Sequence, residues 1–216
     1  MTKRTYDQFC GLAKALDLVG ERWTLLIVRD LSLGPQRYSD LLAGEPGIGT
    51  GLLADRLRHL EEEGLVQRTQ LPPPAAVAVY ELTPDGRALA EAMLPLAVWG
   101  AHRLDYDGGA APYRPEWLFL AVRAQFKPHL AKGVRDVYEF DVDGTSLHVR
   151  IRDGDIDVQR GPAPGGADVT VTTDATTLLA VGIGRESAQE AIAAGRATIE
   201  GSPEAIARCQ AILGPA

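Results

Sequence analysis

The chain has 216 residues, 45% of them hydrophobic, so it can bury one large core or two small ones, and this composition excludes wholesale disorder. No apolar run approaches the roughly 20 residues that span a bilayer, and the first residues lack the apolar stretch of a signal peptide. We therefore expect a cytoplasmic protein with no membrane partner. The net charge of -7 gives no general affinity for nucleic acid, so any phosphate-binding face must be basic locally.

The first half of the chain reads mostly as helices. Residues 10–19 predict a first helix, closed by Gly20, and residues 22–31 predict a second. Because the second is apolar nearly all round, we expect burial on most of its faces. A short helix over residues 38–42 follows, and a turn rich in glycine leads out of it.

The next helix, residues 50–63, has the clearest periodicity in the chain. Leu53, Leu57 and Leu60 recur at i, i+4 and i+7, which predicts one buried stripe. Gly64 suits the C-terminal cap, because glycine readily adopts a left-handed conformation.

A hairpin and a last helix complete this half. Residues 65–70 and 77–83 predict two strands joined by a proline-rich tip. Thr83 suits an N-cap, Pro84 suits the first helical turn, and a helix over residues 85–104 follows. The order of these elements predicts a mainly α winged helix-turn-helix, with the hairpin as the wing.

In such a domain the recognition helix buries one face and offers its N-terminal part to the major groove. The helix of residues 50–63 meets both needs, because its basic side chains lie off the leucine stripe and its acidic run lies at the far end. The alternative is a helical domain with no DNA role, in which these arginines are solvated surface. The candidate DNA contacts are Arg37, Thr50, Gly51, Asp55, Arg56, Arg58, His59 and Arg68.

Three stretches of this half match a known family, in order and at the expected spacing: CGLAKALDLVGERWTLLIVRDLSLGPQRYSDLL, GIGTGLLADRLRHLEEEGLVQR and YELTPDGRAL. They resemble the HxlR-type winged-helix regulators, relatives of the MarR regulators. The resemblance implies a transcription regulator that binds double-stranded DNA as a homodimer, with the first and last helices of the domain forming much of the interface. A dimer would place two recognition helices one DNA turn apart, on a pseudo-palindromic operator.

The two cysteines, Cys10 and Cys209, lie at opposite ends of the chain, so no zinc or disulfide spacing exists. Cys10 aligns with a cysteine that senses oxidants or electrophiles in some HxlR-type regulators, and the resemblance therefore implies a redox role. The alternative, which we favour at this point, is a buried and inert packing cysteine.

A stretch rich in Gly, Pro and Ala separates the two halves. We expect a winged-helix domain over residues 1–105, a linker over residues 106–114 and a second domain over residues 115–216. In the second domain an amphipathic helix precedes alternating strands, and Asp143-Gly144 is a strong hairpin signal.

This second half resembles the sterol-carrier-protein fold, through ADVTVTTDATTLLAVGIG, the ending AIAAGRATIEGSPEAIARCQAIL and the hairpin strands before them. The resemblance implies an α+β domain with one curved, mostly antiparallel sheet and an apolar cavity for a lipid or another small hydrophobic ligand. The alternative is a closed core, because apolar patterning does not separate a core from a cavity. The candidate pocket residues are Trp117, Leu147, Val149, Ile151, Val171, Leu178, Leu179 and Ile183.

We find no signal for a metal, a cofactor or a catalytic group. Asp153, Asp155 and Asp157 have the spacing that opens a calcium loop, but Val158 stands where that loop needs glycine and Pro164 where it needs glutamate. The histidines have no metal spacing and no nucleophile partner.

These patterns predict a transcription regulator whose DNA affinity is controlled by a small hydrophobic ligand. The main alternative is a lipid or hydrophobic small-molecule carrier that uses the winged helix for dimerisation only. An enzyme built on the second domain is a third hypothesis, and the missing set of acid, base and nucleophile argues against it.

Overall fold

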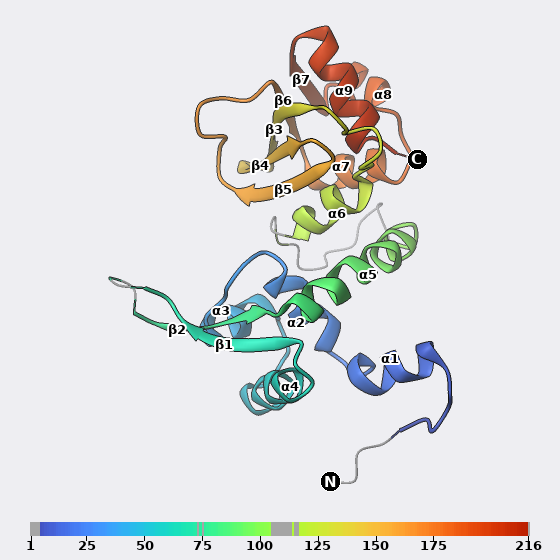
Figure 1. Cartoon of the computed structure of the whole chain (residues 1–216). Helices are drawn as coiled ribbons and strands as arrows, with labels where there is room; N and C mark the ends of the chain where they lie inside the picture. The colour runs from blue at the N-terminus through green and yellow to red at the C-terminus, as the bar shows by residue number, and fades with distance from the viewer. Residues whose placement is uncertain (1–4, 73, 75, 105–113, 115–116, 216) are drawn as a thin grey trace. The chain divides into compact units, whose positions relative to one another are not determined.

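The computed structural model describes residues 5–72, 74, 76–104, 114 and 117–215 (Figure 1). The chain divides into two compact units, Met1–Met93 and Leu94–Ala216. The predicted linker lies outside the described residues, apart from Arg114. None of the described helices is long and apolar enough to cross a membrane.

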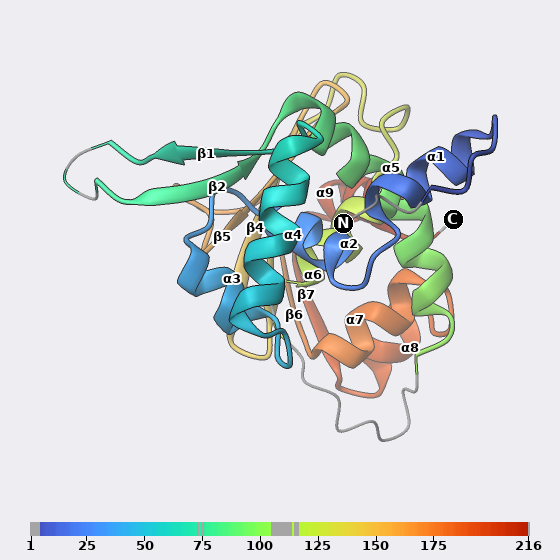
Figure 2. The same cartoon turned by 90° about the horizontal axis from the view of Figure 1, so that it is seen from below.

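The first unit is a winged helix-turn-helix, as predicted. Four helices precede a two-stranded antiparallel hairpin that projects from the helices, and a long helix that runs on into the second unit follows it (Figures 1 and 2). The elements are α1 (Gly11–Val19), α2 (Thr24–Leu31), α3 (Tyr38–Gly44), α4 (Thr50–Glu62), β1 (Val66–Gln70), β2 (Ala78–Leu82) and α5 (Pro84–Ala101).

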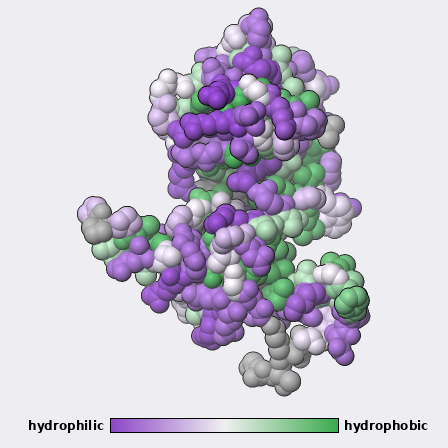
Figure 3. Space-filling view, viewed as in Figure 1, coloured by the Kyte–Doolittle hydropathy of each residue, from purple (hydrophilic) through white to green (hydrophobic). Residues whose placement is uncertain are grey.

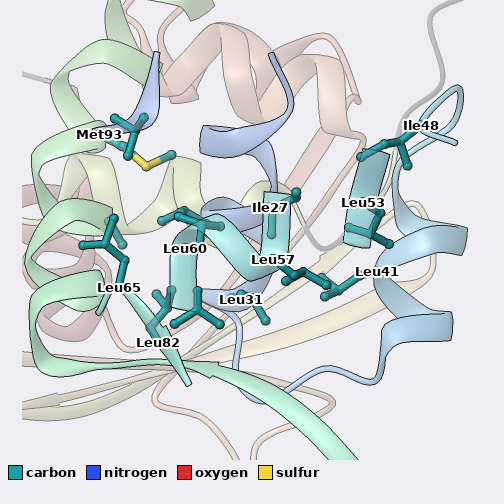
Figure 4. Packing of buried hydrophobic residues seen from close by; sticks show 14 residues of the cluster. Ile27, Leu31, Leu41, Ile48, Leu53, Leu57, Leu60, Leu65, Leu82 and Met93 are labelled. Carbon is teal, nitrogen blue, oxygen red and sulfur yellow. The ribbon is translucent and has the colours of Figure 1, made fainter. Parts of the chain in front are cut away.

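The predicted leucine stripe of α4 forms the centre of the core of this unit (Figure 4). Leu53, Leu57 and Leu60 are each at most 1% exposed. Burying a leucine side chain is worth roughly 1.5–3 kcal/mol, so these three side chains fix the inner face of α4 firmly. The residues packed around them include Ile27, Leu31, Leu41, Ile48, Leu65, Leu82 and Met93.

The ends of α4 and α5 carry the caps that the sequence predicts. Gly64 has a φ of +70°, and the amides of Gly64 and Leu65 donate to the carbonyls of Glu61 and Leu60, which is a Schellman motif. The hydroxyl of Thr83 accepts from the amide of Gly86 at 3.1 Å and caps α5. A Cβ on Gly86 would lie 2.0 Å from the carbonyl oxygen of Leu65, so the close approach of α5 to the start of β1 requires glycine there.

Helix α2 is buried on most of its faces, as its sequence predicts. Its buried residues are Thr24, Ile27, Val28, Asp30 and Leu31. Leu26, which is 39% exposed, is the one exposed residue of this helix.

The second unit is an α+β domain built on one five-stranded sheet. Its first helix ends at Gln125, because Pro128 disfavours a helical Lys127, whose amide donates to the carbonyl of Ile212. The elements are α6 (Leu118–Gln125), β3 (Arg135–Val142), β4 (Thr145–Arg152), β5 (Asp155–Arg160), β6 (Val169–Thr173), α7 (Ala175–Gly182), α8 (Ala188–Ala193), β7 (Ala197–Gly201) and α9 (Pro203–Leu213).

Three of the four strand pairings are antiparallel, as the prediction of a mostly antiparallel sheet requires, but one parallel pair makes the sheet mixed. The strand order is β5-β4-β3-β6-β7. β3 pairs with β6 in parallel, whereas the other neighbouring strands pair antiparallel. The parallel pair arises because the chain leaves β5 at one edge, crosses β4 and β3, and adds β6 on their far side.

One face of this sheet carries the core of the second unit. Tyr138, Leu147, Val149 and Ile151 lie on it and are each at most 1% exposed. Helix α9 packs on the same face, because Arg208 donates to the carboxylate of Asp136, the neighbour of Tyr138 on that face, through Nε at 2.7 Å and Nη2 at 3.1 Å.

Candidate nucleic-acid interface

The N-terminal end of α4 is fixed to α3 and remains exposed. The hydroxyl of Tyr38, the first residue of α3, donates to the carbonyl of Thr50 at 2.6 Å. Thr50 and Gly51 are exposed, and a Cβ added to Gly51 would meet nothing within 4 Å. The first turn of α4 therefore has a defined position and an unobstructed outer surface, which a helix needs to enter the major groove.

The outer face of α4 carries one ion pair. Arg58 donates through Nη1 to Oδ1 of Asp55 at 3.0 Å, and the two side chains are 65% and 61% exposed. Both candidate residues thus lie together on the face opposite the leucine stripe.

The other two basic side chains of α4 face the segment between α1 and α2. Arg56 donates to the carboxylate of Glu21 at 3.0 Å and to the carbonyl of Arg22 at 3.2 Å. Nε2 of His59 donates to the carbonyl of Leu18 at 2.9 Å. The structure therefore places these two candidate residues at a contact within the unit, apart from Asp55 and Arg58.

Arg37 and Arg68 lie at the other predicted positions. Arg37 is the exposed N-cap of α3. Arg68 is exposed on β1, with its guanidinium 6.0 Å from the centroid of the Tyr80 ring across the hairpin. The backbone of Gln36, next to Arg37, pairs with that of Tyr80 at 2.8 and 2.9 Å, so the hairpin and the start of α3 are held together.

A buried ionic contact positions the turn before α4, and the sequence analysis missed it. Arg29 of α2 donates to Glu45, in the turn after α3, at 2.6 Å, and to Asp30 at 2.9 Å. The Glu45 side chain is 3% exposed. A charged residue directly after the apolar run of α2 was the signal available, because a charge that is largely buried needs a partner.

The first half of the chain matches the model of the HxlR-like helix-turn-helix family over residues 18–107. The chain is 37% identical over 92 residues to YvaP of Bacillus subtilis, an uncharacterized HTH-type transcriptional regulator; the match spans 43% of this chain and 85% of YvaP. This chain belongs to the HxlR-like helix-turn-helix family.

Other HxlR-like relatives match the same half. The HTH-type transcriptional regulator YodB of Bacillus subtilis is 34% identical over 41% of this chain and 79% of its own length. Mb3122 of Mycobacterium bovis, an uncharacterized HTH-type transcriptional regulator, is 43% identical over 46% of this chain, and the chain spans 62% of that relative. The solved structure of reduced YodB has a TM-score of 0.40 at 30% identity and covers 47% of this chain and 100% of YodB.

The second half of this HxlR-like chain matches the model of the SCP-2 sterol transfer family over residues 119–214. The predicted pocket residues fall into two groups in the structure. Leu147, Val149 and Ile151 are almost fully buried. The others are only partly buried: Trp117, Val171, Leu178, Leu179 and Ile183. Helix α7 therefore retains solvent access at both of its leucines.

Cys10 of this HxlR-like chain is exposed at the N-cap of α1, so the expectation of a buried packing cysteine is wrong. The backbone N–H groups of Ala13 and Leu12 favour the thiolate and lower the pKa of Cys10 below its ordinary value. Cys209 is buried instead, and burial, with the nearby carboxylate of Asp136, raises its pKa to about 12.

Large apolar side chains of α1 and the segment before it are exposed (Figure 3). Phe9, Leu12 and Leu16 are 113%, 69% and 43% exposed. On α5, Trp99 is 57% exposed, whereas Leu94 and Val98 are partly buried. Among the described residues, no group of three or more His, Cys, Asp or Glu side chains is placed to hold a metal ion.

Proposed function

We propose that this chain is a DNA-binding transcription regulator that acts as a homodimer on a pseudo-palindromic operator. One observation carries the proposal: α4 is anchored through three buried leucines and through Tyr38, while its outer face with Asp55 and Arg58 is exposed. The HTH-type regulators among its relatives support it.

Arg37 and Arg68 supply phosphate contacts on either side of α4 in this proposal. Both are exposed, and the pairing of Gln36 with Tyr80 keeps the two segments at a constant separation. Phosphate contacts of this kind fix the register of the recognition helix on the duplex and give little sequence preference by themselves.

The exposed apolar side chains of α1 and α5 supply the dimer interface in this proposal. Leu12, Leu16, Leu96 and Trp99 are between 43% and 69% exposed. Large exposed apolar side chains mark an interaction site, and a two-fold dimer places the same side chains of both copies against one another.

Fluorescence anisotropy of the full chain with duplexes from the region upstream of its own gene tests DNA binding. We expect Arg58→Ala to weaken specific binding by roughly 1–3 kcal/mol. Arg135→Ala, at an exposed arginine of the second unit, is the matched control and should leave affinity unchanged. Sedimentation of the wild type and of Leu12→Asp tests the dimer. If the full chain binds no duplex DNA even at low salt, the regulator assignment is wrong.

We further propose that the second unit binds a small hydrophobic ligand that changes operator affinity. The match to the SCP-2 family and the partly buried leucines of α7 support this. Native mass spectrometry with a panel of fatty acids and phospholipids tests binding. Leu178→Trp should remove the ligand, and Ile192→Trp, on exposed α8 surface, should not.

The SCP-2 match also favours the carrier function, and one pair of measurements separates the two. A regulator must bind its ligand unequally in its DNA-competent and incompetent states, so the ligand shifts operator affinity. A carrier binds lipid and shows no affinity for duplex DNA.

The role of Cys10 as a sensor is a separate proposal, supported by its exposure and lowered pKa.

A further inference from the structure

Arg58 is the one basic side chain of α4 that faces outward. Arg56 and His59 are engaged with the segment between α1 and α2, through Glu21, the carbonyl of Arg22 and the carbonyl of Leu18. If α4 enters a major groove, Arg58 is therefore the cation of this helix that reaches the bases.

The partner of Arg58 is unusual for a surface that meets DNA. A carboxylate on such a surface repels phosphate, and an ion pair this exposed adds little to the stability of the fold. Asp55 therefore lowers the general affinity of α4 for DNA, and its contribution to helix stability does not compensate for that loss. A gain in the sequence specificity of DNA binding would compensate for it.

We propose that Asp55 and Arg58 act as one unit that selects a G·C base pair, with Arg58 bound to guanine and Asp55 positioning it. This inference rests on the proposed DNA-binding function. Asp55 holds Nη1 of Arg58 at 3.0 Å. Among the described residues Nε and Nη2 have no partner, and this edge of the guanidinium matches the O6 and N7 acceptors of guanine in the major groove.

The carboxylate also weakens a competing role of Arg58, phosphate binding, and restricts the base edges that the pair can contact. Because it neutralises the guanidinium, the pair has little attraction for a phosphate group, so base-edge hydrogen bonds remain as the main interaction. The free lone pairs of Asp55 can accept only from a donor, such as the N4 amino group of cytosine, and they disfavour base edges that present acceptors alone.

The test is selection from a randomised duplex library by the full-length protein, followed by affinity measurements from low to high salt. The wild type should prefer guanine at one position in each half-site by about tenfold or more. Asp55→Ala should flatten that preference and raise the affinity for unrelated duplexes. Arg58→Lys, which retains the charge but not the two-donor edge, should also lose the preference. Glu61→Ala, which removes an exposed negative charge from the same helix without touching the pair, should retain it.

The salt dependence of binding distinguishes a base contact of Arg58 from a phosphate contact. Arg58→Ala should leave the slope of log affinity against log salt unchanged, because Asp55 already compensates its charge. A loss of about one in that slope, with equal weakening on all sequences, is the behaviour of a phosphate contact and overturns the inference. An Asp55→Ala protein that keeps the wild-type preference overturns it as well. If the wild type binds no duplex at all, the proposed function itself is wrong, and this result is distinct from either of the others.

Discussion

The guanidinium of Arg56 lies 3.0 Å from the carboxylate of Glu21 and also donates to the carbonyl of Arg22. The Arg56 side chain is 19% exposed, whereas that of Glu21 is 69% exposed. The contact joins the flank of α4 to the segment between α1 and α2. Arg56 thereby sets the orientation of α4 from the side that the leucines do not cover.

We infer from this contact that Arg56 has a positioning role in place of direct contact with DNA. Arg56→Ala should destabilise the first unit by about 1 kcal/mol, because it removes two hydrogen bonds from a largely buried group. Glu21→Gln, which removes only an exposed charge, should cost less than about 0.5 kcal/mol. Urea unfolding measures both. A direct phosphate contact would instead lower the salt slope of DNA binding by about one in Arg56→Ala and leave stability unchanged.

The leucine stripe should dominate the stability of the first unit. Leu57→Ala leaves a cavity at a site that is 1% exposed and should cost about 2–5 kcal/mol. Leu26→Ala, at a site 39% exposed, is the matched control and should cost far less. Hydrogen exchange of the α4 amides reports on this unit alone. Equal exchange in the two variants would show that the stripe does not hold α4 in place.

Periodicity predicts the inner face of a helix well and its flanks poorly. Leu53, Leu57 and Leu60 were recognisable in the sequence because their spacing matches one face of a helix. The engagement of Arg56 and His59 was not, because it depends on where a segment some 35 to 41 residues earlier in the chain passes. The candidate list for DNA contact therefore included side chains that the structure places at an internal contact.

The parallel pairing in the sheet of the second unit could not be predicted for the same reason: it depends on the path of a distant part of the chain. Each strand of the second unit was predictable from alternation and from turn residues such as Asp143-Gly144. The parallel pairing of β3 with β6 was not, because strand order depends on the path of the connection between β5 and β6. The contact of Arg208 with Asp136 spans 72 residues and has no local signal.

This contact should stabilise the second unit. Asp136 is 7% exposed and accepts from Arg208 and from the hydroxyl of Tyr138 at 2.8 Å. Arg208→Ala leaves the carboxylate without its cation and should cost about 1–3 kcal/mol. Gln210→Ala, at the next exposed position of α9 after Arg208, is the control. Thermal unfolding, monitored by a probe in the second unit, compares the midpoints of the two variants with that of the wild type. An unchanged midpoint in Arg208→Ala would contradict the role assigned to this contact.

Burial of Cys209 predicts a loss of stability at alkaline pH. Its folded pKa of about 12 lies above the ordinary value of 9.0, so the protonated thiol is favoured by folding. The stability linked to it is complete below pH 9 and is lost as the pH rises toward 12, with a slope of at most about 1.4 kcal/mol per pH unit. Cys209→Ser should make the unfolding free energy less steep in this range. Parallel curves for the two proteins would exclude the linkage.

The two thiols should differ in reactivity in the native protein. Cys10 is exposed with a lowered pKa, and Cys209 is buried with a raised one. Because the thiolate is the nucleophile, iodoacetamide should modify Cys10 first, with a midpoint in the pH–rate profile below 9.0, the ordinary value of a thiol. Mass spectrometry of the intact protein should show a single adduct, absent in Cys10→Ser, and two adducts after unfolding in urea. Modification of Cys209 in the folded wild type at the same rate as Cys10 would show that α9 opens readily and that burial does not protect its thiol.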